Sequence, residues 1–182
     1  MAIIVDAAVW PWRDRLWAHL ASDRSFDELH EFAQQMGRRR LGFQGDHYDI
    51  DEHDRLWAIE LGAIVVDPRD LVRRLRAAGL RRRHDKPRWQ RIDFAPTGKT
   101  LDVGKRLVSF GDPGLRLRSA LAHTEALDRV SRSSVYADDS QLVALFDYMG
   151  PQAVVDLEGL DEIWIGQPRR DGERSVELFV GR

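Results

Sequence analysis

Four of the six histidines lie within the first 53 residues, and acidic side chains accompany them. The histidines are His19, His30, His47 and His53. The acids near them along the chain are Asp6, Asp23, Glu28, Asp46, Asp49 and Asp51. Imidazole and carboxylate groups together bind divalent metal ions, and they also act as general acids and bases near neutral pH. This region therefore indicates a polar site that holds a metal ion or transfers protons.

The strands expected around these residues bring some of them together. A short apolar strand at the N-terminus ends immediately before Asp6, and a second strand is expected over 43–50. Polar groups at the carboxyl ends of strands in an α/β sheet converge on a ligand crevice. Alternate residues of a strand share one face, so we expect His47 and Asp49 to point the same way, with Tyr48 on the opposite face.

The metal hypothesis assigns four residues that ligate or position a divalent ion, which is Mg²⁺, Mn²⁺ or Zn²⁺. These residues are Asp6, His19, His47 and Asp49. His30 falls at the border of its helix's apolar stripe and is expected to act as acid or base. The spacing matches no compact metal motif such as H-E-x-x-H. A structural interpretation stays open, in which Asp51 caps a helix, His53 lies on the surface and the others bond neighbouring groups.

Alternating strand and helix signals in the N-terminal half predict a small parallel three-stranded α/β unit. The expected strands cover residues 2–5, 43–50 and 63–66. Ser25 and Glu28 form a capping box at the first helix start. Asp51 and Asp67, the latter followed by proline, are typical N-caps of the next two helices. Strands separated by helices favour parallel pairing with right-handed crossovers.

Residues 81–100 interrupt this rhythm and are expected to be a basic linker between regions 1–80 and 101–182. The C-terminal region is interpreted as an α+β lobe. Helices are expected over 115–130 and 139–148, and a β-hairpin over strands 162–165 and 176–180. The predicted fold class is therefore α/β, with an α+β C-terminal half that carries a hairpin.

The net charge of −2 conceals a separation of the two signs along the chain. Residues 69–91 hold ten Lys or Arg against two Asp, whereas residues 133–168 hold seven acids and no Lys or Arg. A basic patch of this kind binds phosphate or nucleic acid through counterion release. The patch is expected to comprise Arg69, Arg73, Arg76, Arg81, Arg82 and Arg83. The alternatives are solvated surfaces, or attraction between the basic stretch and the acidic half.

Aromatic side chains flank the polar residues near the N-terminus. Trp10-Pro11-Trp12 and Trp17 all lie between Asp6 and His19. Rings beside a polar site stack on a base or a sugar in many nucleic-acid-binding proteins. The same rings can instead wall the core of a small domain, and both interpretations stay open.

The composition excludes several classes of site and of protein. The chain contains no cysteine, which rules out a disulfide scaffold, a thiolate metal site and a cysteine nucleophile. No apolar run approaches the ~20 residues that span a bilayer, and the N-terminus lacks a signal-peptide pattern. We therefore expect a cytoplasmic protein without a membrane partner. Gly98-Lys99-Thr100 does not complete a phosphate loop, because Asp93 stands where the first glycine is required.

Four short sequence blocks, in this order, resemble a family of small bacterial and phage proteins of unknown function. The blocks are Val5-Asp6, Trp17-Ala18-His19-Leu20 with Asp23, Glu28-Leu29-His30, and Gln44-Gly45-Asp46-His47-Tyr48-Asp49. The resemblance covers the first 80 residues and carries over no mechanism. It implies that the motif positions are His19, Asp23, His30, Gln44, His47, Tyr48 and Asp49. On these positions we place Asp23, His30 and His47 in catalysis. Gln44 and Tyr48 are placed with the phosphate-binding arginines.

Three functions are compatible with these features. The first is a hydrolase, specifically a nuclease-like phosphoesterase that acts on a nucleic acid or nucleotide and uses metal-bound water as its nucleophile. The second is a non-catalytic nucleic-acid-binding module that uses the same basic face. The third is an interaction protein whose acidic C-terminal half docks a protein partner. A melting-temperature rise on addition of metal would distinguish the first function from the second.

Overall fold

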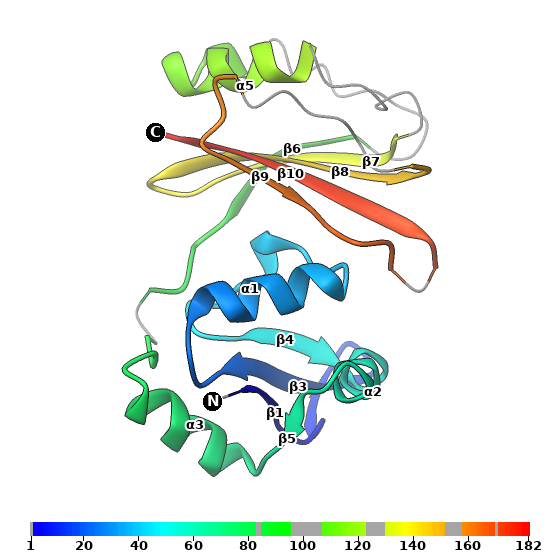
Figure 1. Ribbon diagram of the computed structural model, residues 1–182. Coiled ribbons are helices and arrows are strands. Elements are labelled where there is room, and N and C mark those ends of the chain that lie inside the picture. Colours follow the sequence, from blue (N-terminus) through cyan, green and yellow to red (C-terminus); the bar gives the residue numbers. More distant parts are fainter. Residues whose placement is uncertain (1, 83–84, 96–106, 123–129, 152–157, 170) are drawn as a thin grey trace. The chain divides into compact units, whose positions relative to one another are not determined.

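The computed structural model describes residues 2–82, 85–95, 107–122, 130–151, 158–169 and 171–182. The chain divides into two compact units, an N-terminal unit of Met1–Pro87 and a C-terminal unit of Arg88–Arg182. Each unit is built around its own β-sheet (Figure 1). Within the described ranges, no helix has the length and apolar character needed to cross a membrane.

The sheet of the N-terminal unit mixes parallel and antiparallel pairing. Its strands are β1 (Ile3–Val5), β2 (Trp10–Trp12), β3 (Arg15–Ser22), β4 (Tyr48–Asp51) and β5 (Ile64–Val65). β1 pairs in parallel with β5 and antiparallel with β3, and β3 also pairs antiparallel with β2 and β4. The strands β1, β4 and β5 therefore share one direction. The predicted α/β class with parallel pairing is confirmed.

The strand β3, like β2, is an addition to the three predicted strands. It separates β1 from β4, so these two strands are not neighbours. The sequence pattern predicts no strand here, because consecutive small residues such as Ala21 and Ser22 hide the alternation of buried Ala18 and Leu20 with His19. A strand that pairs along both edges can bury small side chains on both of its faces, and a run of this kind carries little periodic signal.

The α-helices that the structure describes in this unit begin at the predicted caps. They are α1 (Phe26–Gln35), α2 (Glu52–Glu60) and α3 (Pro68–Ala77). The side chains of Ser25, Asp51 and Asp67 each accept a backbone N–H of the first turn, which satisfies donors that the helix leaves unpaired. Glu28 departs from a full capping box, because its carboxylate accepts a hydrogen bond from Ser22 Oγ.

The helices α1 and α3 lie on opposite faces of this sheet (Figure 1). α1 buries Leu29 and Phe32, and its His30 ring bonds Tyr48 of β4. α3 lies on the opposite side and packs Leu71 and Leu75 against a small apolar cluster of β1, β3 and the end of β5. Because α3 packs at the Ala21 end of β3, the stretch of the same face toward His19 and Trp17 remains available for a site.

The C-terminal unit has an antiparallel five-stranded sheet, and the helix α5 (Asp112–Ala122) lies on one face of it (Figure 1). The strands are β6 (Gln90–Ala95), β7 (Val130–Ala137), β8 (Gln141–Met149), β9 (Glu162–Ile165) and β10 (Glu173–Gly181). The spatial order is β6-β7-β8-β10-β9. Leu107 and Leu117 join the core between α5 and the sheet. The predicted pairing of the last two strands is confirmed.

Three expectations for this half differ from the structure. The helix expected over 139–148 is the strand β8, which lies between β7 and β10 and is buried on both faces. A continuous apolar run of this kind does not distinguish a central strand from a buried helix. Of the helix expected over 115–130, α5 covers the part up to Ala122, residues 123–129 lie outside the described residues, and residue 130 begins β7. Residues 90–95 of the expected linker form β6, which pairs with β7.

Candidate metal centre

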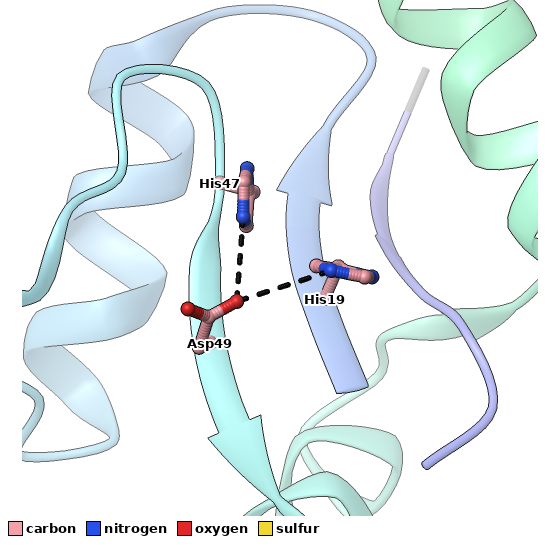
Figure 2. Close-up of side chains that lie close together, drawn as sticks. All are labelled: His19, His47 and Asp49. Atoms are coloured by element: carbon pink, nitrogen blue, oxygen red, sulfur yellow. Dashed lines mark ion pairs between the residues drawn. The ribbon is translucent and has the colours of Figure 1, made fainter. Parts of the chain in front are cut away.

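Three side chains that can bind a metal ion meet on one face of the N-terminal sheet. His19 on β3 stands opposite Asp49 on β4, and His47 precedes β4 by one residue on the same side as Asp49. The Nε2 atom of His47 lies 3.3 Å from Asp49 Oδ1, and His19 Nε2 lies 4.0 Å from the same oxygen. Figure 2 shows Asp49 pointing between the two rings. One ligand atom from each residue lies within 4.8 Å of the others.

Each histidine is held by a buried carboxylate behind it. His19 Nδ1 lies 2.7 Å from Asp6 Oδ2, and His47 Nδ1 lies 2.6 Å from Asp46 Oδ1. Both aspartates are 1% exposed. A carboxylate that accepts the Nδ1 proton fixes the tautomer of a neutral imidazole and leaves the Nε2 lone pair for a metal. The two Nε2 atoms are therefore oriented as ligands toward the side on which Asp49 lies.

Asp6 positions His19, and its oxygens are not directed at a shared ion. Its Oδ1 atom accepts the backbone N–H of His19 at 2.6 Å, while Oδ2 faces the ring. Arg55 Nε donates to the backbone carbonyl of Asp6 at 2.6 Å, which anchors this turn to α2. Both carboxylate oxygens of Asp6 therefore bond His19. Of the two roles expected for Asp6, this geometry favours positioning a ligand over binding the ion directly.

Asp46 plays the matching role for His47, and sequence reasoning gave it no role. Its second oxygen accepts hydrogen bonds from Arg81 Nη1 at 2.8 Å and from the backbone N–H of Arg82 at 3.0 Å. Gly45 beside it has φ +93°, and a Cβ there would lie 3.0 Å from Lys86 N. The signal that could have identified Asp46 is its position directly before His47, combined with the basic residues that follow α3.

The charges around His47 favour its protonated form when no metal is bound. Burial by itself lowers the pKa of His47, but hydrogen bonds to Asp46 and Asp49 outweigh it and raise the pKa above its ordinary value. Burial likewise raises the pKa of Asp49, and the hydrogen bond to His47 reverses that effect and holds the pKa low. A ring between two ionised carboxylates donates from both nitrogens. A metal ion that binds Nε2 of His47 would therefore compete with a proton at that atom.

The donor set and its spacing suit a borderline transition-metal ion. Ligands about 2.1 Å from a tetrahedral ion stand about 3.4 Å from one another, close to the 3.3 Å and 4.0 Å separations observed. Two imidazoles with one carboxylate favour Zn²⁺ or Mn²⁺ over Mg²⁺, which prefers oxygen ligands. The cleft beside the cluster has a volume of ≈ 320 Å³. It is lined by Asp6, Trp10, His19, His47, Pro68, Leu71, Val72 and Arg81.

His30 and Asp23, expected in catalysis, lie away from this cluster. His30 Nδ1 is 2.9 Å from the hydroxyl of Tyr48, whose side chain projects from the opposite face of β4 because strand residues alternate. Asp23 Oδ1 accepts the backbone N–H of Ala2 at 2.6 Å, and its other oxygen pairs with Arg74 at 3.3 Å. Both residues therefore stabilise the fold around β1, β3 and β4. The expectation that Asp23 and His30 act in catalysis together with His47 is therefore corrected.

Gln44 and Tyr48 likewise serve the fold. Gln44 donates its backbone N–H to His47 O at 2.8 Å and its side-chain amide to Gly42 O at 3.1 Å, which closes the turn before β4. Tyr48 was expected to bind phosphate, but it is 0% exposed and cannot reach one. The capping role of Asp51 is confirmed. His53 is exposed, in agreement with the structural interpretation that places it on the surface.

The expected arginine patch divides into two parts. Arg69, Arg73 and Arg76 are exposed on α3 and line a shallow hollow of ≈ 390 Å³, which shares Pro68 and Val72 with the cleft beside the cluster. The remaining arginines of the patch act locally. Arg81 is largely buried against Asp46, Arg82 pairs with Asp85, and Arg83 lies outside the described residues.

Several acids of the C-terminal stretch are engaged within their own unit. Asp147 is 0% exposed and lies 3.5 Å from Arg132 and 3.9 Å from Arg169. Asp161 accepts the backbone N–H of Gly181 at 2.5 Å. Asp138 closes the turn between β7 and β8. Residue 156 lies outside the described residues. These contacts weaken the interpretation of the stretch as a uniform acidic docking surface.

Comparison with known proteins agrees with the resemblance noted in the sequence blocks. Residues 3–78 match the family model "Protein of unknown function (DUF4031)". The DUF4031 match runs from β1 through α3 and includes His19, His47 and Asp49, together with both supporting aspartates. Arg81 and the whole C-terminal unit lie outside it. No curated protein and no solved structure matches the chain.

Proposed function

We propose that the N-terminal unit is a divalent-metal-dependent hydrolase of phosphate esters, a nuclease-like phosphoesterase. The observation that carries the proposal is the paired arrangement of His19 with Asp6 and His47 with Asp46, both rings facing Asp49. Three protein ligands with an open position are the hallmark of catalytic rather than structural zinc sites. His19, His47 and Asp49 would hold the ion, and a bound ion would supply a water that ionises near neutral pH.

The surroundings of the cluster support a phosphate-bearing substrate. Arg81 lines the cleft together with His19 and His47, and it is held in place by Asp46. Beyond Pro68 and Val72, the exposed arginines of α3 form a second basic surface. Guanidinium groups bind phosphate oxygens with matching geometry and neutralise the charge that develops during phosphoryl transfer. Two of the three donor side chains, His19 and His47, thus line a cleft that borders this basic surface of α3.

The test is thermal melting of the intact chain after treatment with chelator, with and without Zn²⁺, Mn²⁺ or Mg²⁺. An ion that binds the folded state raises the midpoint, and we expect Zn²⁺ or Mn²⁺ to act more strongly than Mg²⁺. The variants His47→Ala and Asp49→Ala should lose this rise. His53→Ala is the matched control, because His53 is exposed at the start of α2 and outside the cluster.

Hydrolysis of bis(p-nitrophenyl) phosphate, a generic phosphodiester, provides the second measurement. We expect release of nitrophenol that depends on added metal, is lost in Asp49→Ala and persists in His53→Ala. A protein whose midpoint no divalent ion moves would refute the metal centre. A clear metal response without hydrolysis of any phosphoester would leave a metal-binding protein and refute the phosphoesterase.

A non-catalytic nucleic-acid-binding module remains the second candidate, because one observation favours it. Without metal, His47 already makes two charge-assisted contacts, 2.6 Å to Asp46 and 3.3 Å to Asp49, so the cluster is satisfied as an ion network. Arg69 and Arg76 of α3 are exposed to a phosphate ligand in either case, whereas Arg73 beside them donates to Asp70. In this second function, oligonucleotide binding is unaffected by metal and by Asp49→Ala.

A further inference from the structure

The sheet face that carries the metal cluster continues along β3 into an exposed hairpin. His19 stands opposite Asp49, Trp17 stands between Trp10 and Asp51, and Arg15 stands opposite Trp12. Residues two apart on a strand share a face, and so do residues directly opposite on paired strands. The tryptophans of the hairpin and the histidines of the cluster therefore belong to one continuous surface.

The hairpin displays aromatic rings that a soluble fold ordinarily buries. Trp10 is 53% exposed and Trp12 is 55% exposed, and the proline between them faces the other side of the strand. Trp side chains are highly buried on average, so two such rings on one short strand are an uncommon surface. A surface of this kind marks an interaction site more often than it marks packing.

The hairpin holds these rings in a defined place. The Trp12 and Trp17 rings meet edge to face at 5.4 Å between centroids, and Trp17 Nε1 donates to the carbonyl of Trp12 at 2.9 Å. The guanidinium of Arg13 lies 4.4 Å from the centre of the Trp12 ring. Arg13 and Asp14 at the tip both have positive φ, 50° and 59°, as a tight hairpin turn requires. Positive φ costs conformational free energy in residues other than glycine. The contacts of the hairpin must therefore stabilise this tip.

The inner end of the hairpin borders the metal cleft. The Trp10 ring lies 6.0 Å from the His19 ring, and Trp10 lines the cleft together with His47 and Arg81. Trp12 follows two residues further along the strand, about 6.6 Å away at ordinary strand spacing. A planar group on Trp10 would lie beside the cluster, and a second planar group on Trp12 would lie one step further out.

We propose that Trp10 and Trp12 stack successive bases of a single-stranded nucleic acid and thereby place its backbone at the metal cleft. This inference rests on the proposed phosphoesterase function and names its substrate. Base stacking on exposed aromatic rings tolerates any sequence but needs bases that are not already stacked in a duplex. Arg13 on the hairpin and the exposed arginines of α3 supply the positive charge that a phosphate backbone requires.

The test measures binding without turnover. The full chain in excess chelator is titrated against a fluorescein-labelled oligothymidine of about ten nucleotides, and separately against a duplex of the same length, with fluorescence anisotropy as the readout. Wild-type protein should bind the single strand at least tenfold more tightly than the duplex. Trp12→Ala should weaken single-strand binding by about tenfold, and Trp12→Phe should restore most of the loss, because phenylalanine keeps a stacking face.

Two controls separate this inference from the metal centre. Leu56→Ala removes another apolar side chain, 55% exposed but outside the hairpin, and it should leave oligonucleotide binding unchanged. Trp12→Ala should keep the metal-induced rise in melting midpoint, which shows that the fold and the cluster are intact. Loss of the metal response in wild-type protein would count against the proposed function, whereas an unaltered metal response with no single-strand preference would overturn only the substrate.

Self-association is the competing role for the exposed rings. Light scattering of wild-type protein and of Trp12→Ala decides it, since a hairpin that mediates pairing of two copies would give a dimer that the substitution dissociates. A dimer of this kind, together with oligonucleotide binding that Trp12→Ala does not weaken, would overturn the stacking assignment. A monomer whose single-strand affinity depends on Trp12 supports it.

Discussion

Replacement of His30 by glutamine should make the stability of the N-terminal unit less sensitive to acid. The His30 ring on α1 lies edge-on to Phe43 at 4.7 Å and bonds the Tyr48 hydroxyl at 2.9 Å. Its burial, assisted by the positive charge of Arg40, lowers the pKa from 6.5 to about 4. The unfolded chain therefore binds a proton at His30 with the ordinary pKa of histidine, whereas the folded protein binds it only at lower pH.

The sign and the size of the effect follow from that difference. Above pH 6.5 the ring of His30 is neutral in both states, so its contribution to the free energy of unfolding is fully present. As the pH falls from 6.5 toward about 4, only the unfolded state gains a proton, and stability is lost. At 1.36 kcal/mol per pKa unit the limit is about 3.4 kcal/mol, which partial solvent access reduces to about 2 kcal/mol.

Urea unfolding of wild-type protein and His30→Gln at about pH 7.5 and about pH 4.5 measures this effect. The wild type should lose about 1–2 kcal/mol more than the variant between the two conditions, because glutamine can bond Tyr48 but does not titrate. The histidine ring resonances in NMR spectra give an independent reading. A His30 resonance that titrates near pH 6.5, or identical acid sensitivity of the two proteins, would refute the reasoning.

Three further changes have definite expected outcomes. Asp46→Ala should reduce Zn²⁺ affinity by about 10- to 100-fold in calorimetric titration, because the His47 ring loses its orienting carboxylate; unchanged affinity would exclude that role. Gly114→Ala should lower the melting midpoint of the C-terminal unit, since the added Cβ would lie 1.8 Å from the carbonyl oxygen of Leu107; a helix-stabilising increase would contradict this packing. Joint alanine replacement of the exposed α3 arginines should flatten the salt dependence of oligonucleotide binding by about 0.7 per lost phosphate contact; Arg118→Ala in α5 is the control. These arginines are Arg69, Arg73 and Arg76.

The sequence alone was sufficient for the features that depend on neighbours along the chain. The caps at Ser25, Asp51 and Asp67 mark the helix starts because each side chain bonds an N–H only two or three residues away. The common side of His47 and Asp49 follows in the same way from the two-residue repeat of an extended backbone. Each of these inferences needs knowledge of only a few consecutive residues.

The tertiary structure decided which distant residues meet, and with what consequence. Nothing near His19 in sequence reveals that β3 runs between β1 and β4, although this pairing places the ring between Asp6 and Asp49. Strand pairing also put Tyr48 in the core, on the side of the sheet away from the cluster, where its hydroxyl bonds the half-buried His30. Burial and partners follow from long-range packing, whereas a side chain's chemistry is intrinsic. The sequence could therefore name the donor types, and only the fold could separate ligands from the aspartates that orient them.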